Sequence, residues 1–300
     1  MNIRQLKIFI KVCELESMSK TAESLYMTQP AVSQTIISLE DELGIKLFDR
    51  IGKELNLNYA GEVLLKYARQ ISNLLVEAQT SIENITNMKK GKLKIGASMT
   101  IGTYLLPVML AKFRAAEEHE LELPVIIDNT YSIAKMVAEN EIDLALIEGP
   151  ITNLDLQVEK FYSDQLYLMC SAEHNWADKE LITADMIKCA DFIMREKGSG
   201  TRQIIENNLL KNNIDYRITH VLNNIEAIKK AIAANLGISI LPEIAVTAEL
   251  KSGLIVKKQL ANLNFKRDFN LIFHKDKFWS PLFTEFHNFV LAQNNFKDQF

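Results

Sequence analysis

A group of short polar side chains near the N-terminus could read hydrogen-bonding groups on another molecule. Gln29, Ser33, Gln34 and Thr35 surround and follow Pro30, and they carry donors and acceptors without charge. Amide and hydroxyl groups at the N-terminal end of a helix can reach base edges in a DNA major groove. We therefore predict a DNA-reading helix here. The alternative is a surface helix whose polar face is only solvated.

Neighbouring segments must position that polar face. Apolar residues recur at steps of four, three and four, which predicts a helix from Pro30 to Leu43 with one buried stripe, formed by Val32, Ile36, Leu39 and Leu43. Ser19 can cap the preceding helix and Thr28 the reading helix, because each hydroxyl can accept a free first-turn N–H. Gly44 should end the reading helix.

The flanks of this pair of helices complete a small domain. Residues 3–15 are expected to form a helix that packs behind the pair through Ile3, Leu6, Phe9, Ile10 and Cys13, and Leu47 and Phe48 should fill the core. Asp49 to Asn58 is typical of a two-stranded wing that turns at Gly52-Lys53. Arg50 and Lys53 of the wing could contact a phosphate backbone or minor groove, or could be solvated surface cations.

A long helix should follow, because residues 61–88 contain no proline and no interior glycine. Its apolar positions alternate in steps of four and three, which is a heptad seam, at Leu64, Ala68, Ile71, Leu75, Ala78, Ile82 and Ile85. A single helix cannot bury such a seam, so we predict a homodimer that presents two reading helices to a dyad-symmetric DNA site. The alternative is a helix packed on its own domain.

The rest of the chain alternates strands and helices after a hinge at residues 89–92, which predicts an α/β domain with a parallel sheet. Strands are expected at 93–96, 123–127, 143–147, 166–170, 192–195, 218–222, 238–241 and 268–273. Helices are expected at 102–116, 133–139, 203–210, 226–234 and 281–292. Two crossings, near Ser163 and Arg267, would join two lobes.

Polar residues gather where predicted strands end, and ligands of open α/β sheets bind beyond those ends. They are Ser98, Thr100, Asn129 and Glu148 in the first lobe and Ser199, Gly200, Thr201, Arg202 and Asn224 in the second. Because helix N-termini attract anions, a small anionic effector is our leading hypothesis. Glu148 would repel a bare anion unless a cation or water intervenes. The alternative is that Thr100 and Thr201 merely cap helices.

Composition limits the function classes. The chain has 300 residues, 48% hydrophobic and 24% charged, with a net charge of −4, so it is globular and long enough for several cores. Residues 1–62 hold seven Lys or Arg against nine Asp or Glu, so bulk positive charge does not support DNA binding. Cys13, Cys170 and Cys189 lack metal-site spacing and suggest reduced thiols in the cytoplasm. No apolar run approaches a membrane span.

Two other classes of protein are less consistent with the sequence. An enzyme is disfavoured, because the five histidines are scattered and the sequence shows neither a phosphate-binding loop nor a nucleophile elbow. We therefore expect no catalytic residue, no metal and no cofactor. A solute-binding protein would fit the lobes, but it would explain neither the first 90 residues nor the missing export signal.

The motif also carries a resemblance. AESLYMTQPAVSQTIISLEDELGIKLF at residues 22–48, followed by Asp49 and Arg50, closely resembles the helix-turn-helix of LysR-type transcriptional regulators. The resemblance implies a winged helix-turn-helix (1–58), a dimerising linker helix (59–90) and a two-lobed, periplasmic-binding-protein-like effector domain (91–300). Lobe 1 would hold about 91–162 and 268–300, and lobe 2 about 163–267.

That family implies partners as well: double-stranded DNA, a small effector and further copies of the chain, as dimers or tetramers, with RNA polymerase as another candidate. Within the family, REKGSGTR (195–202) and IEAIKKAIAANLGISILP (225–242) are most similar to members that govern sulfur assimilation or carbon fixation. The family usually has Thr-Pro before the long helix. Asn58-Tyr59 stands here instead, and Asn58 should still cap that helix.

Overall fold

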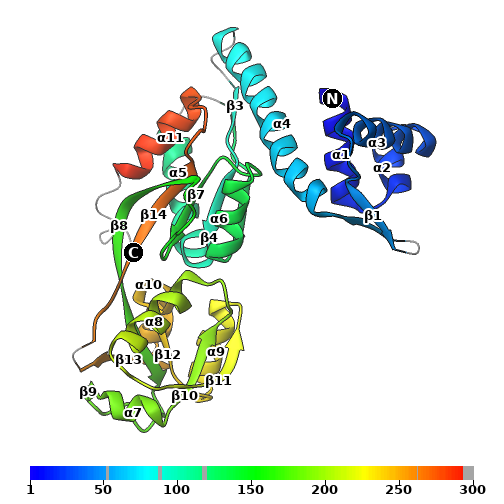
Figure 1. Ribbon diagram of the computed structural model, residues 1–300. Helices are drawn as coiled ribbons and strands as arrows, with labels where there is room; N and C mark the ends of the chain where they lie inside the picture. The colour runs from blue at the N-terminus through cyan, green and yellow to red at the C-terminus, as the bar shows by residue number, and fades with distance from the viewer. Residues whose placement is uncertain (52–53, 87–89, 117–119, 262, 293–300) are drawn as a thin grey trace. The chain divides into compact units, whose positions relative to one another are not determined.

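The computed structural model describes residues 1–51, 54–86, 90–116, 120–261 and 263–292 (Figure 1). The chain divides into two compact units. The first comprises residues 1–88 with 139–141, and the second comprises residues 89–138 and 142–300.

The first unit is a winged helix-turn-helix followed by a long helix (Figure 1). Its elements are α1 (Ile3–Leu15), α2 (Met18–Ser24), α3 (Gln29–Leu43), β1 (Phe48–Ile51), β2 (Glu54–Leu57) and α4 (Tyr59–Thr86). One core holds the unit together, with Phe9, Val12, Val32, Leu39 and Ala68 fully buried at 0% exposure. Leu47 and Phe48 are buried in it, as predicted.

Several local predictions for this unit are wrong. Ser17, not Ser19, caps α2: the Ser17 backbone is extended and its hydroxyl accepts from the Lys20 N–H, whereas Ser19 lies inside the helix. Thr28 holds the N-cap position of α3, but its side chain makes no capping hydrogen bond. Leu43 and Ile3 are exposed, at 39% and 45%, because the core ends at Leu39 and Leu6 on their helices.

Other local predictions are confirmed. Gly44 ends α3 with a left-handed backbone (φ 68°), which a residue without a Cβ adopts most readily. Asn58 caps α4, since its Oδ1 accepts from the Gly61 N–H at 3.0 Å. β1 and β2 pair antiparallel as the wing, with Phe48 opposite Leu57. The turn expected at Gly52-Lys53 lies outside the described residues.

The predicted heptad seam of α4 has a buried part and an exposed part. Ala68 is fully buried and Leu64 packs against the same core, so the first turns of α4 belong to the helix-turn-helix unit. Further along, Ile71 and Ile82 are 36% and 64% exposed, and Leu74 beside the seam is 60% exposed. Within the single chain, these apolar positions of α4 are therefore uncovered.

The second unit consists of two lobes, each with its own core (Figure 1). We call lobe 1 the part built from β4 (Ile95–Ser98), β6 (Val125–Asp128), β7 (Leu144–Glu148), η1 (Ile101–Leu105), α5 (Leu106–Ala116), α6 (Thr130–Ala138) and α11 (Pro281–Leu291). β3 (Lys90–Lys92) and β5 (Glu120–Glu122) form a separate, two-stranded parallel sheet. β4 and β7 are buried along their whole length, as expected of parallel strands covered on both faces.

Lobe 2 holds the remaining elements. They are β9 (Leu181–Ile182), α7 (Ala184–Lys188), β10 (Asp191–Arg195), α8 (Gly200–Lys211), β11 (Arg217–Leu222), α9 (Ile225–Ala233), β12 (Ser239–Pro242), α10 (Glu243–Lys251) and β13 (Ile255–Leu260). β10 and β11 form a parallel pair, and a bridge from Phe192 to Ile238 lies beside β12. Neither α10 nor β13 was expected from the sequence patterns.

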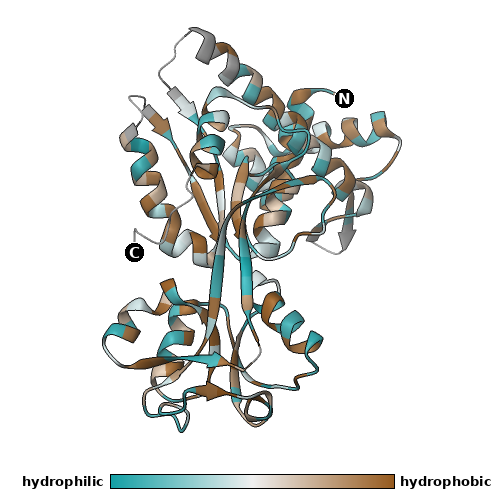
Figure 2. Ribbon diagram, turned by 90° about the vertical axis from the view of Figure 1, so that its left-hand side faces the viewer, coloured by the Kyte–Doolittle hydropathy of each residue, from teal (hydrophilic) through white to brown (hydrophobic). Residues whose placement is uncertain are grey.

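Two long antiparallel strands, β8 (Leu156–Ser171) and β14 (Phe265–His274), run from one lobe to the other (Figures 1 and 2). They pair Ser163 with Asp268 and Asp164 with Arg267, and this crossing stretch is hydrophilic, unlike the strands inside the lobes (Figure 2). The main sheet is therefore mixed, in the order β6-β4-β7-β14-β8-β13-β9 with β12 also on β8. The predicted parallel sheet is confirmed for β4, β6 and β7, but it is wrong around β8 and β14, because these two strands pair antiparallel with each other and with their other neighbours.

Candidate nucleic-acid interface and effector site

The polar face of α3 is presented to solvent at the N-terminal end of the helix. Thr28, Gln29, Pro30 and Gln34 are exposed, and Ser33 is half-buried. The opposite face buries Val32, Ile36 and Leu39 in the core. The apolar stripe thus fixes which way the polar side chains point, and their amide and hydroxyl groups are the types that read base edges.

Two predicted members of this face behave differently. Thr35 is half-buried, and its hydroxyl donates to the Ala31 carbonyl at 2.8 Å, so its proton is used inside the helix. Ser19 is exposed on α2, beside the cap rather than in it. Arg50 lies on wing strand β1, and Lys53 falls outside the described residues.

One residue of this surface was missed by sequence reasoning. Tyr26, in the turn before α3, is 99% exposed and has a left-handed backbone with φ 52°. A fully exposed tyrosine beside a reading helix offers a phenol to a backbone phosphate or base. The composition of the turn offered no signal for this geometry, because it arises from how α2 ends.

In the second unit, the residues predicted at the ends of β4 and β7 meet in one buried corner. Ser98 Oγ and Thr100 Oγ1 both donate to the Glu148 carboxylate, the second at 3.1 Å. The Glu148 N–H in turn donates to Ser98 Oγ at 3.3 Å. Exposure is 1% or less for all three residues. Both hydroxyl protons are therefore already bound by an anion that belongs to the chain itself.

Arg267, on crossing strand β14, connects this corner to the other lobe. Its Nη1 donates to Thr201 Oγ1 at 2.7 Å and lies 3.7 Å from Glu148 Oε1. Its Nε donates to Asp164 Oδ2 at 2.7 Å. Nη2 approaches the same oxygen at 2.6 Å but makes no well-aligned hydrogen bond to a described group. The side chain is fully buried, so a single guanidinium joins lobe 1, the crossing and lobe 2.

The lobes also touch through their backbones. Thr130 Oγ1 donates to the Glu148 carbonyl at 2.9 Å and accepts from the Gly200 N–H at 3.2 Å. A Cβ on Gly200 would lie 1.9 Å from that same carbonyl oxygen, so the close approach requires glycine. The N-terminus of α8 therefore rests against lobe 1 in a closed arrangement.

The other predicted effector residues are likewise engaged within the chain. Ser199 caps α8 by accepting from the Arg202 N–H at 3.4 Å, and Asn224 caps α9 by accepting from the Glu226 N–H at 2.7 Å. Asn129 accepts from the Ser132 N–H at 3.0 Å. Arg202 turns away from the corner, donating to the Arg195 carbonyl and to Glu206, each at 2.8 Å.

A second polar contact between the lobes, from Tyr104 to Glu226, was not predicted from the sequence. Tyr104 Oη of η1 donates to Glu226 at 2.7 Å, and the Lys229 ammonium bridges Glu226 and Glu249 at 2.8 and 3.1 Å. Burial, and then the hydrogen bond to Glu226, raise the pKa of Tyr104 above its ordinary value. Tyr104 thus stays a neutral donor that links the lobes.

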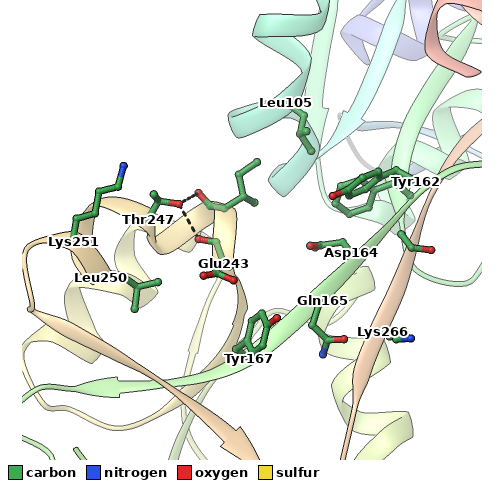
Figure 3. Close-up of a pocket in the computed structure, with 13 residues that line it drawn as sticks. Leu105, Tyr162, Asp164, Gln165, Tyr167, Glu243, Thr247, Leu250, Lys251 and Lys266 are labelled. Carbon is green, nitrogen blue, oxygen red and sulfur yellow. Dashed lines mark hydrogen bonds between the residues drawn. The ribbon is translucent and has the colours of Figure 1, made fainter. Parts of the chain in front are cut away.

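A cavity of about 870 Å³ opens between the crossing strands and α10 (Figure 3). Tyr162, Asp164 and Tyr167 project into it from β8, and Leu105 of η1 closes it on the lobe 1 side (Figure 3). The Thr247 hydroxyl is turned back onto α10, where it donates to the Glu243 carbonyl at 3.1 Å. Since Asp164 also binds Arg267, the cavity wall is connected to the buried corner.

The described part of the chain contains neither a metal-binding cluster nor a membrane-spanning helix. Among these residues, no cluster of His, Cys, Asp and Glu could hold a metal ion. Within the same described ranges, no helix is both long and apolar enough to cross a membrane.

Comparison with known proteins decides what this arrangement is. A family model described as a LysR substrate binding domain matches residues 86–295, and a model described as a bacterial regulatory helix-turn-helix protein of the lysR family matches residues 3–62. The chain belongs to the LysR family of transcriptional regulators. It is thus a DNA-binding regulator with an effector domain, and not an enzyme.

Relatives within the LysR family agree over nearly the whole length. A probable RuBisCO transcriptional regulator of Thalassiosira pseudonana is 34% identical over 294 residues, covering 95% of each chain. The RuBisCO operon transcriptional regulator of Allochromatium vinosum is 30% identical, covering 97% of this chain and 96% of the relative.

Solved structures support the same LysR architecture. CbnR, a LysR family transcriptional regulator, superposes with a TM-score of 0.69 at 21% identity, covering 97% of this chain and 98% of that chain, which supports the fold alone. The regulatory domain of Synechocystis CcmR, in complex with 2-PG, superposes with a TM-score of 0.62 at 28% identity. That match covers 69% of this chain and 99% of the CcmR domain.

Proposed function

We propose that the protein is a homodimeric regulator that binds a dyad-symmetric promoter site through α3 and whose DNA binding responds to a small anionic effector, in the control of carbon-assimilation genes. The polar N-terminal end of α3 carries the DNA part of this proposal, because its exposed amides and hydroxyls are held outward by a buried opposite face. A DNA-binding regulator acts where the chromosome is, so the proposal includes a cytoplasmic location.

A triple substitution tests the reading face. Replacing Gln29, Ser33 and Gln34 together by alanine should abolish the gel shift on the DNA upstream of the protein's own gene, because bidentate amide contacts supply about 1–3 kcal/mol of base discrimination each. Gln79→Ala removes an exposed amide from α4 and should leave the shift unchanged. Unaltered promoter binding by the triple variant would refute the assignment.

Carbon assimilation is supported by the relatives, which are named RuBisCO transcriptional regulators, and by the CcmR regulatory domain, which was solved with 2-PG. The test is isothermal calorimetry with 2-phosphoglycolate, 3-phosphoglycerate, sulfate and sulfite, followed by DNA footprinting in the presence of each ligand that binds. A response to sulfate or sulfite alone would favour the sulfur-assimilation alternative.

The effector site is proposed at the lobe interface, with the residues predicted from the sequence: Ser98, Thr100, Asn129, Glu148, Ser199, Gly200, Thr201, Arg202 and Asn224. The convergence of Ser98, Thr100, Glu148 and Thr201 on one buried corner supports it. Thr100→Ala should weaken binding of the tightest ligand by roughly tenfold, the loss of about one hydrogen bond. Unchanged affinity would place the ligand elsewhere, the Tyr162-lined cavity being the next site to probe.

The exposed seam of α4 supports the dimer, since a row of apolar side chains on a helix needs a partner helix to cover it. A tetramer and a contact with RNA polymerase extend the proposal. Sedimentation of the full-length protein distinguishes dimer from tetramer. A two-hybrid assay against RNA polymerase subunits tests the second contact.

A further inference from the structure

We propose that Arg267 and the N-terminal end of α8 together form the anion subsite, the place where the carboxylate or phosphate group of the effector is bound. Arg267 is not among the effector residues predicted from the sequence, and Thr201 supplies the α8 side of the subsite. The proposal rests on the effector function proposed above, and it says which groups of the interlobe corner hold the charge of the ligand.

Arg267 has a donor that the chain itself does not use. In the part of the chain that the structure describes, two buried side-chain atoms lack a hydrogen-bond partner, and Arg267 Nη2 is the only donor of the two. Nε donates to Asp164 and Nη1 to Thr201, each at 2.7 Å, whereas the contact of Nη2 with the same Asp164 oxygen is not aligned for a hydrogen bond. A buried donor without an acceptor is costly, so an acceptor on a ligand is favoured here.

Thr201 offers two more donors beside that guanidinium. It is the second residue of α8, so its backbone N–H is one of the first-turn amides that have no acceptor inside a helix. Among the described residues, no group accepts this N–H or the proton of the Thr201 hydroxyl, whose Oγ1 accepts from Arg267. The residue is 2% exposed, so bulk water does not reach these donors in the closed arrangement. An oxyanion has the acceptors that they need.

Two carboxylates lie near this guanidinium, so charge alone does not draw an anion to it. Asp164 accepts from one edge of Arg267, and Glu148, which accepts from Ser98 and Thr100, lies 3.7 Å from Nη1. Both α6 and α8 begin at this corner, and each helix N-terminus contributes roughly half a positive charge. Together with Arg267 they offset the two carboxylates, so the unused donors decide whether an anion binds.

The other two buried arginines of lobe 2 are already engaged. Arg195 donates through Nε and Nη2 to Glu196, and Arg202 donates to the Arg195 carbonyl and to Glu206. Arg267 is therefore the buried cation that lies against the start of α8 with a donor to spare.

Binding at this subsite would favour closure of the lobes. Arg267 lies on a strand that joins the lobes, and Thr201 belongs to lobe 2. An anion that accepts from both holds the start of α8 where the Gly200 N–H donates to Thr130 of lobe 1. Because Arg267 and Thr201 are buried, the ligand enters while the lobes are separated and is enclosed when they close.

Calorimetry of the full-length protein with 2-phosphoglycolate, 3-phosphoglycerate, glycerate and sulfate tests the subsite. Glycerate carries only a carboxylate and sulfate only a tetrahedral oxyanion, so these two ligands distinguish the kinds of anionic group. Thr201→Val removes the hydroxyl at nearly constant volume, and Arg267→Lys keeps a cation beside Asp164 but loses Nη2. Each substitution should weaken binding of the tightest ligand by at least about tenfold, because a hydrogen bond to a charged group is lost.

Thr201→Ser keeps the hydroxyl and should bind as wild type does. If Thr201→Ser instead loses as much affinity as Thr201→Val, the side chain acts through packing and not through its proton, which overturns the assignment. Thermal unfolding confirms that each variant is folded. Should Arg267→Lys fail to fold, the comparison of Thr201→Val with Thr201→Ser still decides.

Lys266→Met is the matched control. Lys266 precedes Arg267 on β14, where neighbouring side chains point to opposite faces, and it is exposed, so its loss should leave every affinity unchanged. Weaker binding by Lys266→Met alone would place the ligand in the Tyr162-lined cavity, which Lys266 also lines, and would overturn the subsite. Ligands that bind Thr201→Val and Arg267→Lys as tightly as wild type would overturn the subsite but not the effector function. A wild type that binds none of the four ligands would overturn both.

Discussion

At the scale of single residues, the molecule depends on a few buried charges whose partners come from distant parts of the chain. Arg267 is the clearest case, because it is fully buried and touches Glu148, Asp164 and Thr201 from three different elements. The sequence placed Arg267 at a lobe crossing but offered no sign of its partners. An alternating strand shows which face a residue is on, and not what the neighbouring strand brings opposite it.

Removing this guanidinium should be costly. Arg267→Met leaves the buried Glu148 and the half-buried Asp164 without this cation, and breaking a buried pair from one side destabilises a fold by about 3–5 kcal/mol. Thermal and urea unfolding of the full-length variant and wild type measure this loss of stability. Arg217→Met is the control, because Arg217 and Asp191 form an exposed pair, at 65% and 49%, worth at most about 1 kcal/mol. Equal losses in the two variants would contradict the role of Arg267.

The thiols give a prediction that depends on pH. Burial raises the pKa of Cys13 to about 12 and that of Cys170 to about 11, whereas Cys189 is exposed. The thiolate is the reactive form, so at a pH of about 8 Cys13 and Cys170 are almost wholly protonated in the native protein. A disulfide reagent such as Ellman's should label Cys189 rapidly and the other two only after unfolding. Rapid native labelling of Cys189→Ser protein would show that the burial is not maintained.

At the scale of elements, patterning succeeded where one face of a segment is buried by its own neighbours. Helices α1, α3 and α11 begin and end within one residue of their predicted bounds. The prediction failed for β8, of which only residues 166–170 were expected, because the apolar residues in its first ten positions do not alternate regularly with polar ones. Caps were misassigned where a hydroxyl was chosen by type, since Ser17 and Ser19 differ only in backbone conformation.

Helix α4 carries the prediction at this scale. Ile71→Asp with Ile82→Asp places two carboxylates on the exposed part of the seam and should convert a dimer to monomers with the helix-turn-helix core intact. Gln79→Asp introduces the same residue off the seam as the control. Analytical ultracentrifugation of the full-length proteins reports the mass. Wild-type protein that sediments as a monomer would remove the basis for the dyad-symmetric site.

At the scale of the whole second unit, β8 and β14 join the cores of the two lobes, so separation of the lobes is the expected movement. The closed arrangement depends on Gly200, where any side chain would meet the Glu148 carbonyl. A hinge and a close backbone contact together allow a ligand to shift the balance between open and closed forms of this unit.

Gly200→Ala tests this closure. The added Cβ should hold the lobes apart, so the amide of Tyr131, which donates to the Gly198 carbonyl of lobe 2 at 3.1 Å, should exchange with deuterium faster than in wild type. Amides inside α8, such as that of Ile205, should be unchanged and serve as the internal control. Faster exchange at both places would mean that lobe 2 itself has loosened, and protection at Tyr131 equal to wild type would rule out the steric account.

The order of most elements, the reading helix with its outward polar face, and the family all follow from the amino-acid sequence, because they depend on local periodicity and on a motif of contiguous residues. The sequence also indicated that Ser98, Thr100 and Glu148 would lie close together, since polar side chains at the ends of parallel strands gather at one edge of a sheet. Only the tertiary structure shows that Ser98 and Thr100 donate hydrogen bonds to Glu148 and that Arg267 joins the lobes. Those contacts span 48 positions of sequence or more, and no local pattern specifies which groups the fold brings together over such distances.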